Sequence, residues 1–180
     1  MNAKEEYNIR LEMSDMHEEF IDKMSVAYDD KFYVEAVWYC YAIFDQRISR
    51  LIAKYIDKCT LPKRTNKTTA AISTRINCLK KLVNTKYGAF DSFDVNLLNR
   101  ILDWCHKRNE LVHGLVSLEH YKKYDDEFKK LASLGVPLVF ELYDACTNFR
   151  NKWYESDEPK GQFPMNCKCT NNKCINENCI

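Results

Sequence analysis

The amino-acid sequence predicts an all-α fold, a bundle of four or five helices followed by a short cysteine-rich tail. The chain has only four glycines and four prolines among 180 residues, so few positions would interrupt a helix. Apolar residues recur at steps of three and four through most of the chain, and no stretch alternates with the period of two expected of a strand. With 46% apolar and 29% charged residues, the chain can bury a core between packed helices.

The chain begins with two predicted helices and a loop. Residues 1–29 carry a weak apolar periodicity under heavy charge, which predicts a helical extension. The next segment, residues 30–58, repeats apolar residues as a long core helix would, and Asp29 or Asp30 is its predicted N-cap. The polar, basic segment 59–69 contains one proline and is predicted to be a loop.

Two further helices are predicted after this loop. Residues 70–84 have the apolar spacing of a helix, and residues 97–113 have it more strongly. The segment between these helices is predicted to be a turn. We expect Asp91 or Ser92 to cap the second helix, and Gly114 to end it as the first residue beyond its last turn.

The last part of the chain holds two more predicted helices and then changes composition. Residues 119–133 have the pattern of a helix charged on one side, which Gly135 and Pro137 are expected to break. A final helix is predicted over about residues 137–154. The chain thus divides into four parts: an N-terminal helical extension (1–29), a helical bundle (30–154), a linker (155–166) and a cysteine-rich tail (167–180).

The helix over residues 97–113 carries polar side chains within its apolar face. On a helical wheel with about 100° per residue, Arg108 lies about 20° from Ile101, the centre of the apolar arc. Asn109 lies about 80° from that centre, also inside the arc. His113 lies at the edge of the arc, one turn after Asn109.

Two interpretations of these polar side chains are open. Arg108 could be structural, bound to a carboxylate or to carbonyl groups elsewhere in the bundle, because a buried charge requires a partner. His113 could be a surface residue favoured by the helix dipole. Alternatively, Arg108, Asn109 and His113 form a compact cationic, hydrogen-bonding site that is suited to a phosphate.

The stretch Arg108-Asn109-Glu110-Leu111-Val112-His113 resembles the R-x4–6-H motif of the HEPN superfamily, in which an asparagine is favoured directly after the arginine. HEPN domains are helical bundles, and many are ribonucleases of prokaryotic toxin and phage-defence systems. The resemblance covers the helical part of the chain, about residues 30–154. It implies a metal-independent endoribonuclease, a toxin or antiviral defence effector, that works as a homodimer with the two motif helices facing each other.

The residue types of the motif fit this chemistry, because RNA supplies its own nucleophile, the 2′-OH. His113 would act as general base or acid. Arg108 would neutralise the charge that builds on the phosphate, and Asn109 would orient the phosphate or His113. No cofactor is required for catalysis, and the products would be a 2′,3′-cyclic phosphate or 3′-phosphate and a 5′-OH.

The sequence gives weaker indications of further RNA contacts and of protein partners. Lys107 and Arg100 are candidates for contacts with the RNA backbone and His106 for a substrate contact, although solvated surface charge is the alternative for each. The net charge of +1 means that an RNA site must be a local patch. The resemblance allows an antitoxin or regulatory partner. HEPN toxins paired with minimal nucleotidyltransferase antitoxins often continue as His-x-Tyr, whereas a leucine stands two positions after His113 here.

Four cysteines gather in the last fourteen residues: Cys167, Cys169, Cys174 and Cys179. Four thiolates this close suffice for a structural, tetrahedral Zn²⁺ site, and a segment with so few apolar residues would need a metal to fold. The spacing resembles the zinc knuckle C-x2-C-x4-H-x4-C, but the first spacer is one residue short and Cys174 replaces the histidine. Redox or disulfide chemistry and an unstructured tail with free thiols are the alternatives.

Sequence features of export or membrane insertion are lacking. The first twenty residues are acidic and polar, and the longest apolar run, residues 36–44, is too short to span a bilayer. We therefore expect a cytoplasmic protein without a membrane partner. Two other functions stay open: a non-catalytic HEPN-like module that binds RNA, a nucleotide or a protein through Arg108, and an unrelated helical interaction domain.

Overall fold

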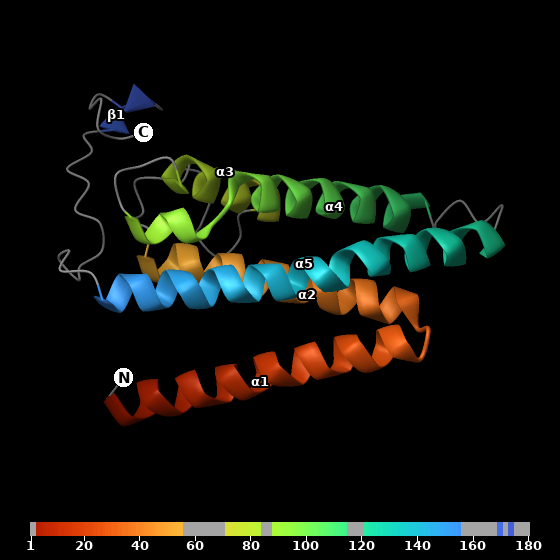
Figure 1. The fold of residues 1–180 in the computed structure, drawn as a ribbon, viewed down its shortest axis with the longest axis horizontal. Coiled ribbons are helices and arrows are strands. Elements are labelled where there is room, and N and C mark those ends of the chain that lie inside the picture. Colours follow the sequence, from red (N-terminus) through yellow and green to blue (C-terminus); the bar gives the residue numbers. More distant parts are fainter. Residues whose placement is uncertain are drawn as a thin grey trace. The chain divides into compact units, whose positions relative to one another are not determined.

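The computed structural model describes residues 3–55, 71–83, 88–114, 121–155, 169–170 and 173–174. Helices make up almost all of this part, so the all-α prediction is confirmed for it. Its elements are α1 (Ala3–Asp29), α2 (Tyr33–Tyr55), α3 (Ile72–Val83), the 3₁₀ helix η2 (Gly88–Ser92), α4 (Val95–Gly114), α5 (Tyr121–Glu155) and the short strands β1 (Cys169–Thr170) and β2 (Lys173–Cys174), as Figure 1 shows. Within these ranges, a helix with the length and apolar character of a membrane span is not found.

The chain divides into two compact units, each assembled from segments that are far apart in the sequence. Unit 1 combines residues 1–43 with residues 104–139, and unit 2 combines residues 44–103 with residues 140–180. Helices α2, α4 and α5 each contribute one part to each unit. The four-part division of the chain that its composition suggests stays a prediction.

The turn from α1 to α2 has the hydrogen bonds of a Schellman motif. The N–H of Phe32 donates to the carbonyl of Ala27 at 2.7 Å, and the N–H of Lys31 donates to the carbonyl of Tyr28 at 3.1 Å. Lys31 takes the left-handed conformation that this motif requires, with φ at 65°. The chain therefore passes from one helix into the next within a few residues.

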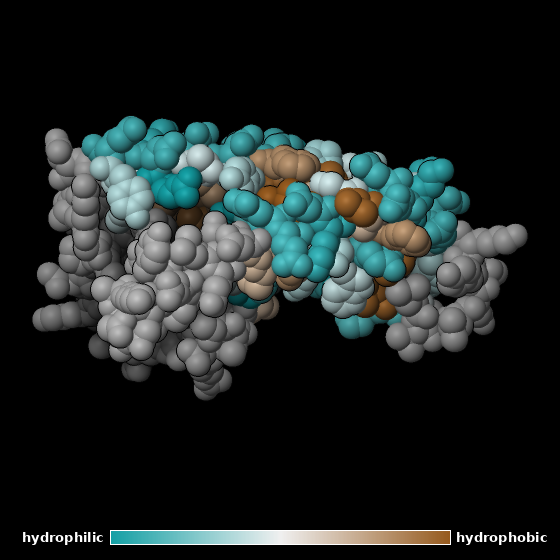
Figure 2. All heavy atoms as spheres, turned by 90° about the horizontal axis from the view of Figure 1, so that it is seen from below, coloured by the Kyte–Doolittle hydropathy of each residue, from teal (hydrophilic) through white to brown (hydrophobic). Residues whose placement is uncertain are grey.

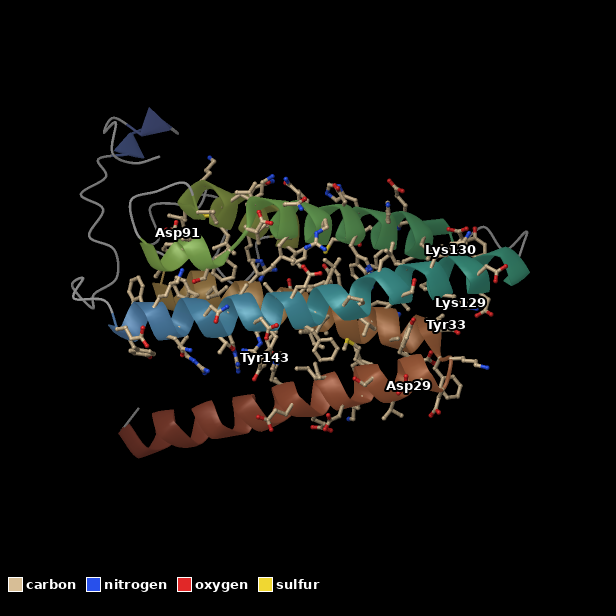
Figure 3. The ribbon with its side chains drawn as sticks, viewed as in Figure 1. Asp29, Tyr33, Asp91, Lys129, Lys130 and Tyr143 are labelled. Atoms are coloured by element: carbon tan, nitrogen blue, oxygen red, sulfur yellow. The ribbon has the colours of Figure 1, made fainter. Side chains whose placement is uncertain are left out.

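This turn makes the predicted N-cap of α2 wrong. Asp29 is the last residue of α1, and Asp30 still donates its N–H to the α1 carbonyl of Val26 at 2.9 Å. The first carbonyl that accepts within α2 is that of Phe32, at 3.0 Å from the N–H of Ala36. Asp29 and Tyr33, both labelled in Figure 3, stand on either side of the turn.

The predicted N-cap of α4 is also wrong. Asp94 holds that position, because its Oδ1 accepts from the N–H of Asn96 at 2.9 Å and its carbonyl accepts from the N–H of Leu98 at 3.1 Å. Asp91 and Ser92 lie in η2 instead, one turn earlier. Asp91, Ser92 and Asp94 all have side chains suited to an N-cap. Because Asp91 and Ser92 are part of η2, α4 begins only after Asp94.

Apolar side chains of α1, α2, α4 and α5 form the core of unit 1. The indole N–H of Trp104 donates to the carbonyl of Leu131 at 2.8 Å. Gly135 packs against the same ring, and a Cβ at this position would lie 2.7 Å from Trp104 Nε1. Among the residues of unit 1 whose burial is described, the buried apolar ones are Met24, Ala27, Ala36, Val37, Cys40, Ile43, Trp104, Cys105, Phe128, Leu131, Ala132, Leu138 and Val139.

Helix α5 continues through Gly135 and Pro137, so the break predicted there is wrong. A proline inside a helix costs about 3 kcal/mol, because it has no N–H to donate to the carbonyl four residues earlier. Burial on both sides of Pro137 offsets this cost, since Ala132 and Val139 are fully buried. Gly135 also allows the close approach of Trp104, which no larger residue would allow.

Unit 2 has its own core, which is centred on aromatic rings. The ring centroid of Phe149 lies 4.9 Å from that of Phe90, 5.6 Å from that of Phe93 and 5.8 Å from that of Trp153. Contacts of this kind are favourable beyond the area that they bury. They fix the second half of α5 to η2 and to the segment before α4.

The buried cysteines of the described helices are reduced. Cys40, Cys78, Cys105 and Cys146 form no disulfide. Burial raises the pKa of Cys40 and of Cys146 to about 12, so both thiols stay protonated at neutral pH. They act as small apolar side chains in the core.

Candidate functional site

The second half of α4 lies in unit 1 and carries the three residues of the predicted motif. Arg108 is only 8% exposed, Asn109 is half-buried and His113 is exposed. Arg108 therefore lies on the buried side of the helix, among apolar residues. Gly114 is the last residue of α4, not the first residue beyond it, and its carbonyl accepts from the hydroxyl of Tyr124 at 2.7 Å.

Two aromatic residues of α2 hold the guanidinium of Arg108. Its Cζ lies 4.1 Å from the ring centroid of Trp38 and 4.5 Å from that of Tyr41. The two rings stand three positions apart, so they project from the same side of α2. Cation–π contacts of this kind contribute about 0.5–2 kcal/mol each. In addition, Nη1 of Arg108 donates to the amide oxygen of Asn109 at 3.1 Å.

The guanidinium nevertheless lacks hydrogen-bond acceptors. Nε and Nη2 of Arg108 are buried without a partner among the described residues. The ion pairs found in the described part of the chain do not include Arg108. A buried N–H without an acceptor costs about 1–3 kcal/mol. Within the described ranges, no carboxylate neutralises this arginine, as the structural interpretation would require.

Arg75 in unit 2 shows how a buried arginine is ordinarily accommodated. It is 5% exposed, and its guanidinium donates to the carboxylate of Asp45 and to the hydroxyl of Ser49, both on α2. Arg108 has aromatic rings where Arg75 has a carboxylate. Its positive charge therefore has no carboxylate counterion among the described residues.

His113 is not brought together with Arg108 within one copy of the chain. Five residues turn an α-helix through about 140° and advance it by about 7.5 Å. Accordingly, Arg108 is buried while His113 is exposed. The structure thus joins Arg108 to Asn109 by a hydrogen bond and places His113 on a different side of α4.

The three further residues predicted to contact RNA fall into different units. Arg100 lies in unit 2 and forms an ion pair with Glu141 through both carboxylate oxygens, with Nη1 at 3.0 Å from Oε1. Hydrogen bonding between the two lowers the pKa of Glu141 and raises that of Arg100. His106 and Lys107 lie in unit 1, beside the motif, and both are exposed.

Trp38 and Tyr41 are the site residues that sequence reasoning missed. Tyr41 fits the apolar stripe of a core helix, so its contact with a charge is not visible in the pattern. The spacing of the two rings on one side of α2 was a usable signal. Which helix faces that side is a tertiary property, however, and periodicity along the chain does not contain it.

The cysteine tail is described only at two short strands. β1 and β2 pair antiparallel, with Cys169 opposite Cys174. Cys167 and Cys179 lie outside the described residues. Where the chain is described, no group of three or more His, Cys, Asp or Glu residues is arranged to hold a metal ion. The zinc site in the tail stays a prediction.

The motif region of unit 1 thus contains two groups on the same helix, five residues apart. One is the buried, incompletely hydrogen-bonded guanidinium of Arg108, and the other is the exposed imidazole of His113. Such groups bind anions and transfer protons. Comparisons with protein-family models, curated proteins and solved structures give no match to this chain.

Proposed function

We propose that this protein is a metal-independent endoribonuclease of the HEPN type, a toxin or defence effector, whose site forms between two copies of the chain. The observation that carries the proposal is the guanidinium of Arg108. It is buried against aromatic rings, bonded to Asn109 and without a carboxylate in the described residues. A cation in this state gains much from an anion, and the resemblance of the motif makes that anion an RNA phosphate.

The separation of Arg108 and His113 is the reason for proposing two copies. The two side chains leave α4 about 140° apart, so one copy does not aim both at the same phosphate. A two-fold axis beside α4 would place two such helices against each other. Arg108 of one copy would then meet His113 of the other, and each dimer would hold two equivalent sites.

The proposed reaction needs one proton to be removed and one to be supplied. The 2′-oxygen of RNA attacks the adjacent phosphorus while His113 accepts the proton of the 2′-OH. As the O2′–P bond forms, the P–O5′ bond breaks, and water protonates the departing 5′-oxygen. Arg108 stabilises the negative charge that grows on the phosphate. The products are a 2′,3′-cyclic phosphate and a 5′-OH.

Substrate binding must also open the contacts of Arg108. Because Nε and Nη2 are buried, a phosphate reaches the guanidinium only after the Asn109 amide or the Tyr41 ring has moved aside. Side-chain rotation is fast and needs no change in the helices. New hydrogen bonds to the phosphate would satisfy the N–H groups that lack acceptors, which offsets the lost ring contact.

A non-catalytic binding module is the second candidate. The different sides of α4 on which Arg108 and His113 lie favour it, because a module that only binds an anion needs Arg108 and not His113. Such a protein would bind RNA or a nucleotide as a single copy and leave it intact. The two candidates therefore differ in their dependence on His113.

The direct test is incubation of the protein with total RNA in EDTA, comparing wild type with Arg108→Ala and His113→Ala. We expect wild type to cleave RNA to 2′,3′-cyclic phosphate and 5′-OH ends. Loss of either group should slow cleavage by at least about 100-fold, while far-UV circular dichroism stays unchanged. Lys130→Ala is the control, because it removes an exposed charge of unit 1 that pairs with Glu127.

Three outcomes would contradict the nuclease proposal. RNA that is bound but never cut by wild type would support the binding module. Equal cleavage by all four proteins would assign the activity to other residues or to a contaminant. The absence of both binding and cleavage would reject both candidates.

A further inference from the structure

Trp38 is the exposed tryptophan of this protein, and it lies at the proposed site. All three tryptophans of the chain are in the described residues. Trp104 is 2% and Trp153 9% exposed, whereas Trp38 is 51% exposed. Its indole is therefore available to a ligand, although it stands in direct contact with the buried Arg108.

The contact with Arg108 uses only part of the indole. The guanidinium carbon lies 4.1 Å from the ring centroid, which is the distance of a cation stacked on the ring face. The remaining surface, about half of the side chain, faces solvent. Because one face is held by the guanidinium, the ring has fewer orientations to lose when a flat ligand stacks on it.

The charge in contact with the ring suits a nucleic-acid strand. Arg108 is the cation that touches Trp38, whereas the exposed His106, Lys107 and His113 lie on other sides of α4. Glu35, three residues from Trp38, and Glu110 are exposed carboxylates. Cationic groups that contact phosphates, together with an aromatic ring on which a base stacks, are the two features of proteins that bind single strands. Both features meet at Trp38 and Arg108.

We propose that Trp38 stacks on an unpaired base of the RNA, next to the phosphate that binds Arg108. The proposal rests on the proposed function and specifies its substrate as single-stranded RNA. A base inside a duplex is stacked on both sides and offers no free face, whereas a base in a loop or a strand end does. Since the ring touches the guanidinium, the stacked base and the bound phosphate belong to the same or adjacent nucleotides.

The observations favour a base over a protein as the occupant of this ring. Stable protein interfaces bury about 800 Å² on each side around a dry, apolar centre. Trp38 instead lies on a guanidinium and three residues from the exposed Glu35. Figure 2 shows one face of the molecule, on which hydrophobic residues appear in small groups among hydrophilic ones.

The test distinguishes the contribution of the base to binding from that of the phosphate. Two strands are compared in EDTA by fluorescence anisotropy: oligo(U) RNA and an abasic ribose-phosphate strand of the same length and charge. The protein carries His113→Ala, so that neither strand is cut. We expect oligo(U) to bind about 10-fold tighter than the abasic strand, and we expect tryptophan emission to be quenched by oligo(U) alone. Trp38→Leu should abolish the preference, so that oligo(U) binds no tighter than the abasic strand.

Two matched variants exclude the possibility that Trp38 affects RNA binding only by positioning Arg108. Tyr41→Leu removes the other ring that touches Arg108 but keeps the exposed indole, so it should retain the preference for oligo(U). Trp38→Phe keeps a smaller ring face and should retain part of that preference. It also serves as the informative variant if Trp38→Leu does not fold.

Three results would overturn the proposal. If Trp38→Leu lost affinity for both strands equally, the ring would only position Arg108. A dimer that dissociates in Trp38→Leu, measured by light scattering, would assign the ring to a second copy of the chain. An unchanged preference in Trp38→Leu and Trp38→Phe would exclude stacking. Failure of the nuclease proposal looks different, because wild type would then prefer oligo(U) but leave it uncut.

Discussion

Two arginines are buried in the described part of the chain, and their surroundings differ in kind. Arg75 donates to Asp45 and Ser49 through Nη2 and Nη1, which fixes α3 on α2 and leaves its Nε without an acceptor among the described residues. Arg108 rests on Trp38 and Tyr41 and keeps two N–H groups without an acceptor among the described residues. Arg75 therefore has the surroundings of a structural residue, whereas Arg108 has no carboxylate partner among the described residues, and we propose that it binds a ligand.

The two arginines should respond differently to methionine. Arg108→Met should leave the free energy of unfolding within about 1 kcal/mol of wild type, because an apolar side chain of similar length replaces an incompletely paired charge. Arg75→Met should lower it by about 1–3 kcal/mol, because Asp45 and Ser49 lose their donor. Urea unfolding followed by circular dichroism measures both. An Arg108→Met protein as unstable as Arg75→Met would make Arg108 structural.

At the scale of helices, periodicity predicted positions well and boundaries less well. The spacing of apolar residues placed α3 and α4 within a few residues of their observed bounds. The caps were misassigned, because Asp29, Asp30, Asp91 and Ser92 all have suitable side chains and differ only in the backbone around them. Pro137 was taken for a helix end, because the packing of α5 that offsets its cost is tertiary.

The α1–α2 turn allows a direct measurement of backbone strain. Lys31 has φ at 65°, where an L-residue is disfavoured and glycine is not. Lys31→Gly should therefore raise the free energy of unfolding by about 0.5–1 kcal/mol relative to Lys31→Ala, which removes the same side chain but keeps the strain. Thermal and urea unfolding of the pair measure it. Equal stabilities would mean that the turn relaxes to another conformation.

At the scale of the whole molecule, unit 1 contains every residue of the proposed site. Two of them, Trp38 and Tyr41, lie on α2, and the other three, Arg108, Asn109 and His113, lie on α4, about seventy positions later in the sequence. The sequence alone pointed to the α4 residues, because a charge in an apolar arc is visible on one helix. The two rings of α2 share one side of that helix, which their spacing shows, but their contact with Arg108 was not predictable because it depends on which helices meet.

The central claim is that Arg108 of one copy and His113 of another act on the same phosphate. It is tested most directly by a mixed dimer, in which one differently tagged copy carries Arg108→Ala and the other carries His113→Ala. After purification through both tags, RNA cleavage is measured in EDTA beside each parent dimer. One intact site should remain in the mixed dimer, which should recover about half of the wild-type rate while both parents stay inactive. A mixed dimer that forms but cleaves no faster than its parents would contradict the account.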